Sequence, residues 1–170
     1  MSDVKTFFAS IDNYEKGGVE ITGKDTAEHY LFSNMFEVAE NSKPWQRVVV
    51  ATNLEYVMEC VRAEGESSWY VCAHDENVLV MEGGIDTHFV KPTDSSTVPA
   101  DDKGGAVKLD VEPDGQKMGW VKAEQGHMTL LPAGAAYQIR ARELSVLLIQ
   151  TIKGDESVEK WAEICQRSVA

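Results

Sequence analysis

The stretch WYVCAHDENVLVMEGG, residues 69–84, decides the fold that the sequence predicts. Its first half places polar and aromatic residues at every second position, so an extended chain would present them on one face of a sheet. These residues are Tyr70, Cys72, His74 and Glu76. The second half is an apolar run that ends in a glycine pair, which signals a turn. The stretch therefore predicts strands. The alternating residues allow three interpretations: a metal site, a metal site that has been lost, or an ordinary strand.

Strand-like segments continue from this stretch to residue 150. They are short, apolar or alternating, and clusters of Gly, Pro, Asp and Ser separate them. The segments are WYVCA, NVLVM, IDTHFV, AVKLDV, GWVKA, MTLLP, AAYQIRA and LSVLLIQTI. Short strands at this fairly even spacing predict an all-β barrel or sandwich. Residues 92–105, PTDSSTVPADDKGG, have the composition of a mobile loop.

The segments on either side of the strands are more varied. Residues 1–29 are polar and predict an N-terminal arm, which leaves residues 30–170 as a single domain. RVVVA at residues 47–51 predicts a strand. Apolar residues at helical spacing predict a short helix near 53–64 and a C-terminal helix near 156–167. Their apolar positions are Leu54, Val57, Met58 and Val61 in the first, and Val158, Trp161, Ala162 and Cys165 in the second.

Composition excludes several classes of function. The chain has 170 residues, enough for one domain with a real core, and a formal net charge of -12. Such a charge repels phosphate backbones and anionic lipids, so nucleic acids and membranes are poor partners. No apolar run approaches the roughly 20 residues of a membrane span or resembles a signal peptide, which predicts a cytoplasmic protein. Cys60, Cys72 and Cys165 lie far apart and are expected to be reduced.

Two motifs resemble those of the cupin superfamily. Glu76 and Gly83 have the separation found in the first cupin motif. GHMTLLPAGAAYQIRA matches the second motif through Gly126, Pro132 and Gly134. The resemblance covers about half of the chain and implies an antiparallel jelly-roll barrel.

The same motifs carry four metal-binding positions in cupins. Here those positions are Tyr70, Cys72, Glu76 and Tyr137, so only the glutamate is retained. Two phenols and a thiol do not replace imidazoles at neutral pH without strong pKa shifts. The resemblance therefore implies a cupin barrel that holds no metal of its own.

Two alternatives stay open from the residues alone. A displaced metal site could use Cys72, His74 and Glu76, which share strand parity, and would make the chain a self-sufficient metalloenzyme. A stand-alone cupin could instead bind a small organic ligand among the four degenerate positions. The other histidines indicate no site: His88 is interpreted as part of a solvated outer face and His127 as a turn residue.

Longer stretches resemble the small (alpha) subunit of the two-component hydroquinone 1,2-dioxygenases, from about residue 28 to residue 165. They include EHYLFSNMFEVAENSKPWQRVVV, GAVKLD, GHMTLLPAGAAYQIRA and VEKWAEIC. The resemblance implies a larger cupin subunit that carries Fe(II), and a reaction of hydroquinone with O2 that gives 4-hydroxymuconic semialdehyde in para-nitrophenol catabolism. It implies that this chain has no cofactor, is inactive alone, and supports and closes its partner's active site.

Aromatic residues are the candidates for a phenol pocket or a partner interface, because large rigid rings dominate subunit contacts. Trp69 is the first candidate, since it directly precedes the degenerate motif and is expected near the barrel mouth. The other candidates are Trp45, Tyr70, His74 and Trp120. Core packing is the alternative role for each tryptophan.

Overall fold

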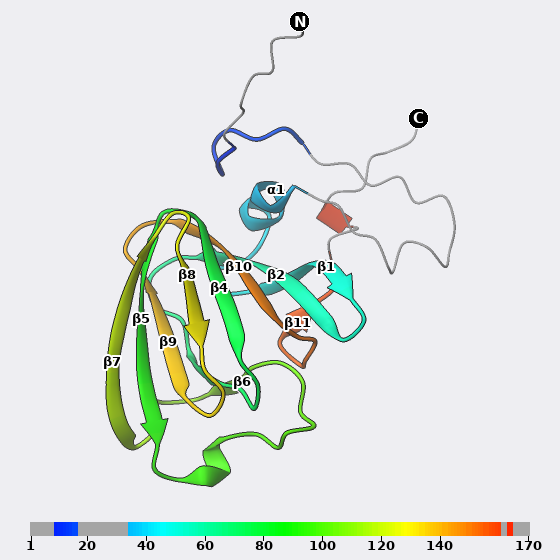
Figure 1. Ribbon diagram of the computed structural model, residues 1–170. Helices are drawn as coiled ribbons and strands as arrows, with labels where there is room; N and C mark the ends of the chain where they lie inside the picture. The colour runs from blue at the N-terminus through cyan, green and yellow to red at the C-terminus, as the bar shows by residue number, and fades with distance from the viewer. Residues whose placement is uncertain (1–8, 17–33, 161–162, 165–170) are drawn as a thin grey trace, which may run out of the picture.

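The computed structural model describes residues 9–16, 34–160 and 163–164, which form two facing β-sheets and one short α-helix (Figure 1). The sheet of six strands has the order β11-β1-β2-β10-β4-β8, and the sheet of five has the order β6-β3-β9-β5-β7. All pairings are antiparallel except that of β1 with β11. The predicted all-β barrel architecture is confirmed. No helix among the described residues is long and apolar enough to cross a membrane.

The elements follow one another along the chain, and the connection between β5 and β6 is the longest one after β1. They are α1 (Met35–Glu40), β1 (Arg47–Asn53), β2 (Tyr56–Ala63), β3 (Trp69–Val71), β4 (Glu76–Glu82), β5 (Gly84–Pro92), η1 (Ser95–Thr97), β6 (Val107–Leu109), β7 (Gly115–Glu124), β8 (Met128–Leu131), β9 (Ala136–Ala141), β10 (Ser145–Ile152) and β11 (Ser157–Val158). Every strand expected between residues 69 and 150 is present, as is the one expected at 47–51. The expected loop 92–105 joins β5 to β6 and contains the 3-10 turn η1.

The main core lies between the two sheets. Side chains that point inward from both sheets form one cluster, which includes Val61, Val78, Ile85, Tyr137 and Leu147. Each is at most 2 % exposed. Burial of an aliphatic side chain of this kind stabilises the fold by about 1.5 to 3 kcal/mol relative to leaving it in water. The cluster fills the interior of the barrel and thereby fixes the side chains that surround its centre.

The helix predicted near residues 53–64 is wrong, because β2 occupies this segment. Inward-facing Val61 belongs to the main core, whereas outward-facing Cys60 belongs to a second cluster on the other side of the sheet. A strand with apolar residues on both faces loses the alternation that marks a half-exposed strand. The spacing of Leu54, Val57, Met58 and Val61 therefore imitated a helix.

The second cluster exists because α1 packs on β2, beside the end of the six-stranded sheet (Figure 1). Asn34 caps the helix: its side chain accepts a hydrogen bond from the backbone N–H of Phe36. Val38 and Ala39 are fully buried against the sheet. The sequence analysis did not predict this helix, since one and a half turns are too short for a periodic signal.

The terminal predictions are tested only in part. Residues 157–158 form the parallel strand β11, so the predicted C-terminal helix does not begin at 156. Residues 163–164 are helical, while Trp161, Ala162 and Cys165 lie outside the described residues. Most of the predicted N-terminal arm also lies outside them. Within the described part of that arm, Ile11 is buried in the second cluster.

The motif glycines make the turns that the cupin resemblance implies. Gly83, Gly126 and Gly134 all have positive φ, the region that favours glycine. At Gly83 the space is also closed: a Cβ there would lie 2.3 Å from Oγ of Ser145. The turn between β4 and β5 therefore requires glycine. The alignment of Glu76, on the strand before this turn, depends on the same glycine.

Candidate functional site

The four degenerate ligand positions meet inside the barrel. Tyr70 on β3, Cys72 just after it, Glu76 on β4 and Tyr137 on β9 are all buried. The hydroxyl of Tyr137 donates a hydrogen bond to Oε2 of Glu76 at 2.5 Å, and the ring centroids of Tyr70 and Tyr137 are 5.9 Å apart. The positions that bind a metal in cupins therefore form one cluster here, in which Cys72 and Tyr137 hydrogen-bond to Glu76 and Tyr70 packs on the ring of Tyr137.

Arg47 on β1 places its guanidinium in the middle of this cluster. Nη2 donates to Oε1 of Glu76 at 2.6 Å, and Nε donates to Oε2 of Glu59 at 2.5 Å. Nη1 donates to the hydroxyl of Tyr137 at 3.2 Å. The guanidinium carbon also lies 5.7 Å from the ring centroid of Tyr70, within cation–π range. A cation from the chain itself thus binds the one acid that this chain retains among the four ligand positions, Glu76.

Sequence reasoning missed Arg47 and Glu59 because neither lies in a motif. The available signal was a charged residue at an inward position of an apolar strand, as in RVVV and in MECV. Arg47 is 4 % exposed, Glu59 1 % and Glu76 0 %. Buried charges of this kind are rarely found unpaired. Arg47 and Glu59, on neighbouring strands, therefore predict that each charge has an oppositely charged partner within the barrel.

The charges in the cluster shift its pKa values. Burial alone would raise the pKa of Glu76, but the nearby Arg47 charge and hydrogen bonds from Cys72, Tyr137 and Thr151 hold it below its usual value. Burial opposes the charge on Arg47, yet Glu76, Tyr137 and Glu59 raise its pKa above the usual value. Arg47 and Glu76 therefore form an ion pair, both charged.

The thiol and phenols of the cluster are shifted in the opposite sense. Burial, reinforced by the Glu76 carboxylate, raises the pKa of Cys72 far above its usual value. Burial and the same carboxylate raise the pKa of Tyr137. Burial also raises the pKa of Tyr70. Cys72, Tyr70 and Tyr137 are consequently neutral hydrogen-bond donors at neutral pH, not anionic ligands.

The displaced triad weighed from the sequence does come together. One ligand atom from each of Cys72, His74 and Glu76 lies within 4.8 Å of the other two. The side chain of His74 is held by β10: its Nε2 lies 2.9 Å from Oγ1 of Thr151 and accepts from the backbone N–H of Ile152 at 3.3 Å. A cation at this triad would require Cys72 to lose its proton and would compete with Arg47 for Glu76.

The barrel offers little space for a ligand. The cavity beside Arg47 has a volume of about 10 Å³ and is bounded by Trp45, Arg47, Tyr70 and Tyr137, among others. The indole of Trp45 packs against the main core, and its N–H donates to the carbonyl of Glu64 at 2.8 Å. About one water molecule fits into such a space. An organic ligand does not fit there without rearrangement of these side chains.

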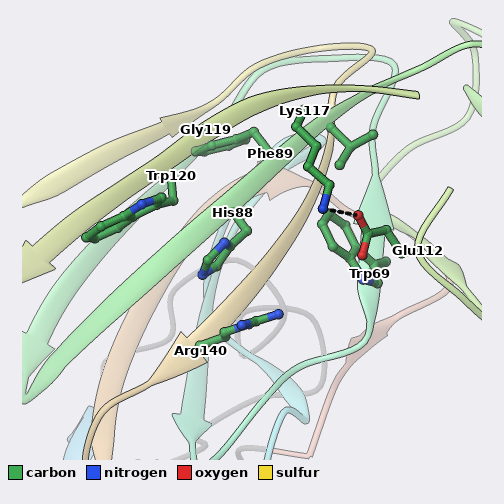
Figure 2. Close-up of a pocket in the computed structure, with 9 residues that line it drawn as sticks. Trp69, His88, Phe89, Glu112, Lys117, Gly119, Trp120 and Arg140 are labelled. Carbon is green, nitrogen blue, oxygen red and sulfur yellow. Dashed lines mark ion pairs between the residues drawn. The ribbon is translucent and has the colours of Figure 1, made fainter. Parts of the chain in front are cut away.

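A larger hollow lies on the outer face of the five-stranded sheet, and we call it the aromatic groove (Figure 2). Its volume is about 170 Å³. The indole of Trp120 stacks on the His88 ring, with centroids 6.2 Å apart and an interplanar angle of 24°. Trp69 lies at the other end of the groove, and the cations Lys117 and Arg140 lie beside the rings.

The structure separates the five candidate residues taken from the sequence. Trp69 and Trp120 share the aromatic groove on the outer face of the five-stranded sheet. Trp45 lines the small cavity beside Arg47, and Tyr70 is inside the barrel with 7 % exposure. Successive residues of a strand point to opposite faces, which is why the side chains of Trp69 and Tyr70 lie on opposite faces of the five-stranded sheet. His74 is half-buried beside β10.

Solved structures similar to this chain identify its family. A chain of hydroquinone 1,2-dioxygenase PnpCD, in complex with Cd2+ and 4-hydroxybenzonitrile, shares 49% sequence identity over 98% of this chain and 99% of that chain, with a TM-score of 0.82. A chain of hydroquinone 1,2-dioxygenase from Sphingomonas sp. TTNP3, with 4-hydroxybenzoate bound, shares 48% identity over 98% and 100% of the two chains, with a TM-score of 0.85. This chain belongs to the hydroquinone 1,2-dioxygenase family.

Membership confirms the family resemblance seen in the sequence and makes the chain part of a dioxygenase family. A second, longer chain of PnpCD, in complex with Fe3+, shares the fold alone: identity is 13%, the TM-score is 0.57, and the match covers 82% of this chain and 38% of that chain. No protein-family model matches the sequence, and no curated protein matches it either.

Proposed function

We propose that this chain is the metal-free small subunit of a hydroquinone 1,2-dioxygenase that opens the ring of hydroquinone with O2. A larger cupin subunit would carry Fe(II), and this chain would support and close the site in that partner. The product would be 4-hydroxymuconic semialdehyde, as in the degradation of para-nitrophenol. The single observation that carries the metal-free role is Arg47, whose guanidinium pairs with the one retained ligand residue, Glu76.

Charge explains why Arg47 and a metal ion exclude each other. A cupin metal is a cation surrounded by imidazoles and a carboxylate. In this barrel the carboxylate of Glu76 already binds a cation at 2.6 Å, and the neighbouring phenols and thiol are neutral donors. Donors that point their protons at the site repel a second cation instead of binding it. The residues present therefore fit a divalent metal poorly.

The comparisons support a partner subunit. Two kinds of chain occur under the name PnpCD: one matches this chain along 99% of its length, and a longer one contains the same fold within 38% of its length. A longer chain with its own cupin domain is the kind of partner that the proposal needs. The barrel of this chain then remains as a scaffold whose outer surface contacts that partner.

In the complex, this chain would bind and shield the substrate without taking part in the redox chemistry. Iron held by the larger subunit would supply the activation of dioxygen. Trp69 and Trp120, which share the outer face of the five-stranded sheet, are the proposed contacts to the phenol pocket or to the partner. Rigid aromatic walls orient a planar ring and exclude water, both of which favour ring cleavage over side reactions.

Metal analysis of the purified chain, alone and co-expressed with a larger cupin subunit, tests this function. We expect stoichiometric iron and oxygen consumption with hydroquinone only when both subunits are present. The matched variants are His74→Ala and Cys72→Ser, which remove two members of the displaced triad and should leave the iron content of the complex unchanged. Stoichiometric iron in the lone chain that disappears in His74→Ala would establish the self-sufficient metalloenzyme instead.

The stand-alone ligand-binding cupin is the weaker alternative. It requires an open barrel, whereas the cavity beside Arg47 measures about 10 Å³. The Arg47 ion pair and the ring of Tyr137 occupy the space that such a ligand would need.

A further inference from the structure

We infer that the tip of the β1–β2 hairpin is a docking element that inserts Leu54 into an apolar socket on the larger cupin subunit. The rim of that socket carries a lysine or arginine for Glu55. The inference rests on the proposed function, because it names a surface by which this chain binds its partner. Figure 1 shows the hairpin on the side of the barrel away from β7, so this contact is separate from the aromatic groove.

The turn at the tip has two central residues, Leu54 and Glu55, because Asn53 and Tyr56 on either side of them are paired. Leu54 has a φ of 57°, and it is the one central residue with a positive φ. A positive φ at the first central residue alone is the pattern of a type II′ hairpin turn, in which glycine is preferred at that position. The Cβ of a leucine crowds the backbone at positive φ, so the turn keeps this residue against its local preference.

Leu54 also leaves its side chain in water. It is 92% exposed, more than any other large apolar residue among those that the structure describes. Glycine or asparagine would suit the turn without exposing an apolar side chain. Backbone strain and an exposed leucine at one residue are both unfavourable in the isolated chain, which indicates a role outside the stability of its own fold.

A recess on the outer face of the six-stranded sheet adjoins the tip. Its volume is about 260 Å³, and its lining includes Asn53, Tyr56, Met58 and Gln150. Met58 and Gln150 are paired across β2 and β10, and Met58 packs on the second cluster, outside the barrel. The side chain of Leu54 does not fold back into this recess, since it stays almost fully exposed. The hairpin therefore presents an apolar projection next to a depression, and a partner surface can be complementary to both.

Charge distinguishes a different partner from a second copy of this chain. Glu55 is exposed at the tip, and within the described part of the chain its carboxylate forms no ion pair. The residues that line the recess are all neutral, so the recess of a second copy offers no cation to Glu55. Two copies would also repel each other, because each has a formal net charge of -12. The tip therefore fits another protein that has a basic residue beside an apolar pocket.

The larger subunit is the occupant that the comparisons favour. Under the name PnpCD, a longer chain occurs besides one that matches this chain along 99% of its length. A standard interface covers about 800 Å² of each partner, so Leu54 is one anchor within a wider contact. A few buried side chains supply most of the free energy of such an interface. Loss of one buried leucine side chain then weakens binding by about 10- to 100-fold.

Biolayer interferometry between the purified full-length chain and the larger subunit tests the inference. Leu54→Gly removes the apolar side chain and supplies the residue that the turn prefers. We expect it to bind about 10- to 100-fold more weakly, with a Tm no lower than that of the wild type. Leu54→Met keeps an apolar side chain and should bind within about threefold of the wild type. The control Leu144→Gly removes a leucine that is 38% exposed beside the opposite end of β10, and it should change the affinity by less than about twofold.

Hydrogen exchange of the wild-type complex provides a measurement without a variant. The amides of residues 52–57 should exchange at least about tenfold more slowly in the complex than in the free chain. Glu55→Lys should weaken binding, and the loss should be larger at low salt than at high salt.

The outcomes separate this inference from the proposed function. Wild-type affinity in Leu54→Gly, or unchanged exchange of residues 52–57 in a complex that does form, would overturn the inference and leave the proposed function intact. Self-association of the lone chain that Leu54→Gly abolishes would assign the tip to a second copy and overturn the inference as well. Failure of the wild-type chain to bind the larger subunit at all would overturn both.

Discussion

Replacement of Arg47 by methionine is the sharpest test of the buried cluster. The substitution keeps a long apolar side chain in the barrel but removes the cation that lies between Glu59 and Glu76. Both carboxylates are at most 1 % exposed, so water cannot solvate them in place of the guanidinium. The variant therefore keeps two buried acids and loses the charge that compensates them.

The expected cost follows from that geometry. Removal of one partner from a buried ion pair costs about 3 to 5 kcal/mol, because the remaining charge is left uncompensated. For a domain of this size such a loss lowers Tm by roughly 6 to 20 °C. If a bound metal ion and not Arg47 compensated Glu76, the same substitution would cost much less in a metal-loaded chain.

Urea unfolding of the metal-free chain, followed by circular dichroism, measures the loss. Lys43→Met is the control for removal of a cation. Because Lys43 is exposed, this substitution should change the free energy of unfolding by about 0.5 kcal/mol or less. The triple variant Arg47→Met, Glu59→Gln, Glu76→Gln removes all three charges together. It should recover more than half of the loss, because whole buried ion networks are often replaceable at little cost.

The pH dependence provides a second measurement. In the wild-type chain the pKa of Glu76 is depressed, so its contribution to stability is present above its unfolded pKa and is lost as pH falls through the folded value. Without Arg47, burial dominates and raises the pKa of Glu76, so the penalty is present at neutral pH and is relieved as pH falls. The difference in stability between the two proteins should therefore shrink as pH falls from neutral through the depressed folded pKa of Glu76. A loss smaller than 1 kcal/mol at pH 7, or one independent of pH, would refute the reasoning.

Three further predictions concern single residues around the same barrel. Tyr137→Phe removes a hydrogen bond to a charged group, so it should lower the free energy of unfolding by about 1.5 to 3 kcal/mol in urea titrations, with no loss for a surface Tyr56→Phe control. Gly83→Ala places a Cβ against Ser145 at positive φ and should destabilise by about 1 to 3 kcal/mol, measurable as a lower Tm. Cys72 is buried and its pKa is raised, so mass spectrometry should find it unmodified after iodoacetamide treatment of the native chain at pH 8 and alkylated after treatment in urea.

Local sequence patterns were enough to predict the strands that follow residue 69. Each strand from β3 to β10 has one face toward the core or is bounded by turn residues, which is what period-two and turn signals report. The pattern failed at β2, whose outward Cys60 is covered by α1. Whether the outer face of a strand is covered by another element depends on tertiary packing, which the residues of that strand alone do not reveal.

The candidate site shows the same limit. The motif spacing correctly brought Tyr70, Cys72, Glu76 and Tyr137 together, because the glycine turns fix the strands that carry them. Arg47 was not predicted, since it reaches Glu76 from a strand 29 positions earlier that carries no motif. The aromatic groove was also unforeseen: Trp69, His88 and Arg140 come from three strands that become neighbours only through the order of the five-stranded sheet.

The guanidinium at the centre of the barrel has a consequence for how such a protein is made. A cation supplied by the polypeptide is present from translation onward, so the proposed metal-free role predicts that maturation of this chain needs no metallochaperone and no iron supply. It cannot change valence, escape to a chelator or be replaced by zinc. Cells short of iron would then still accumulate the finished chain, and EDTA in a refolding buffer should leave the yield unchanged.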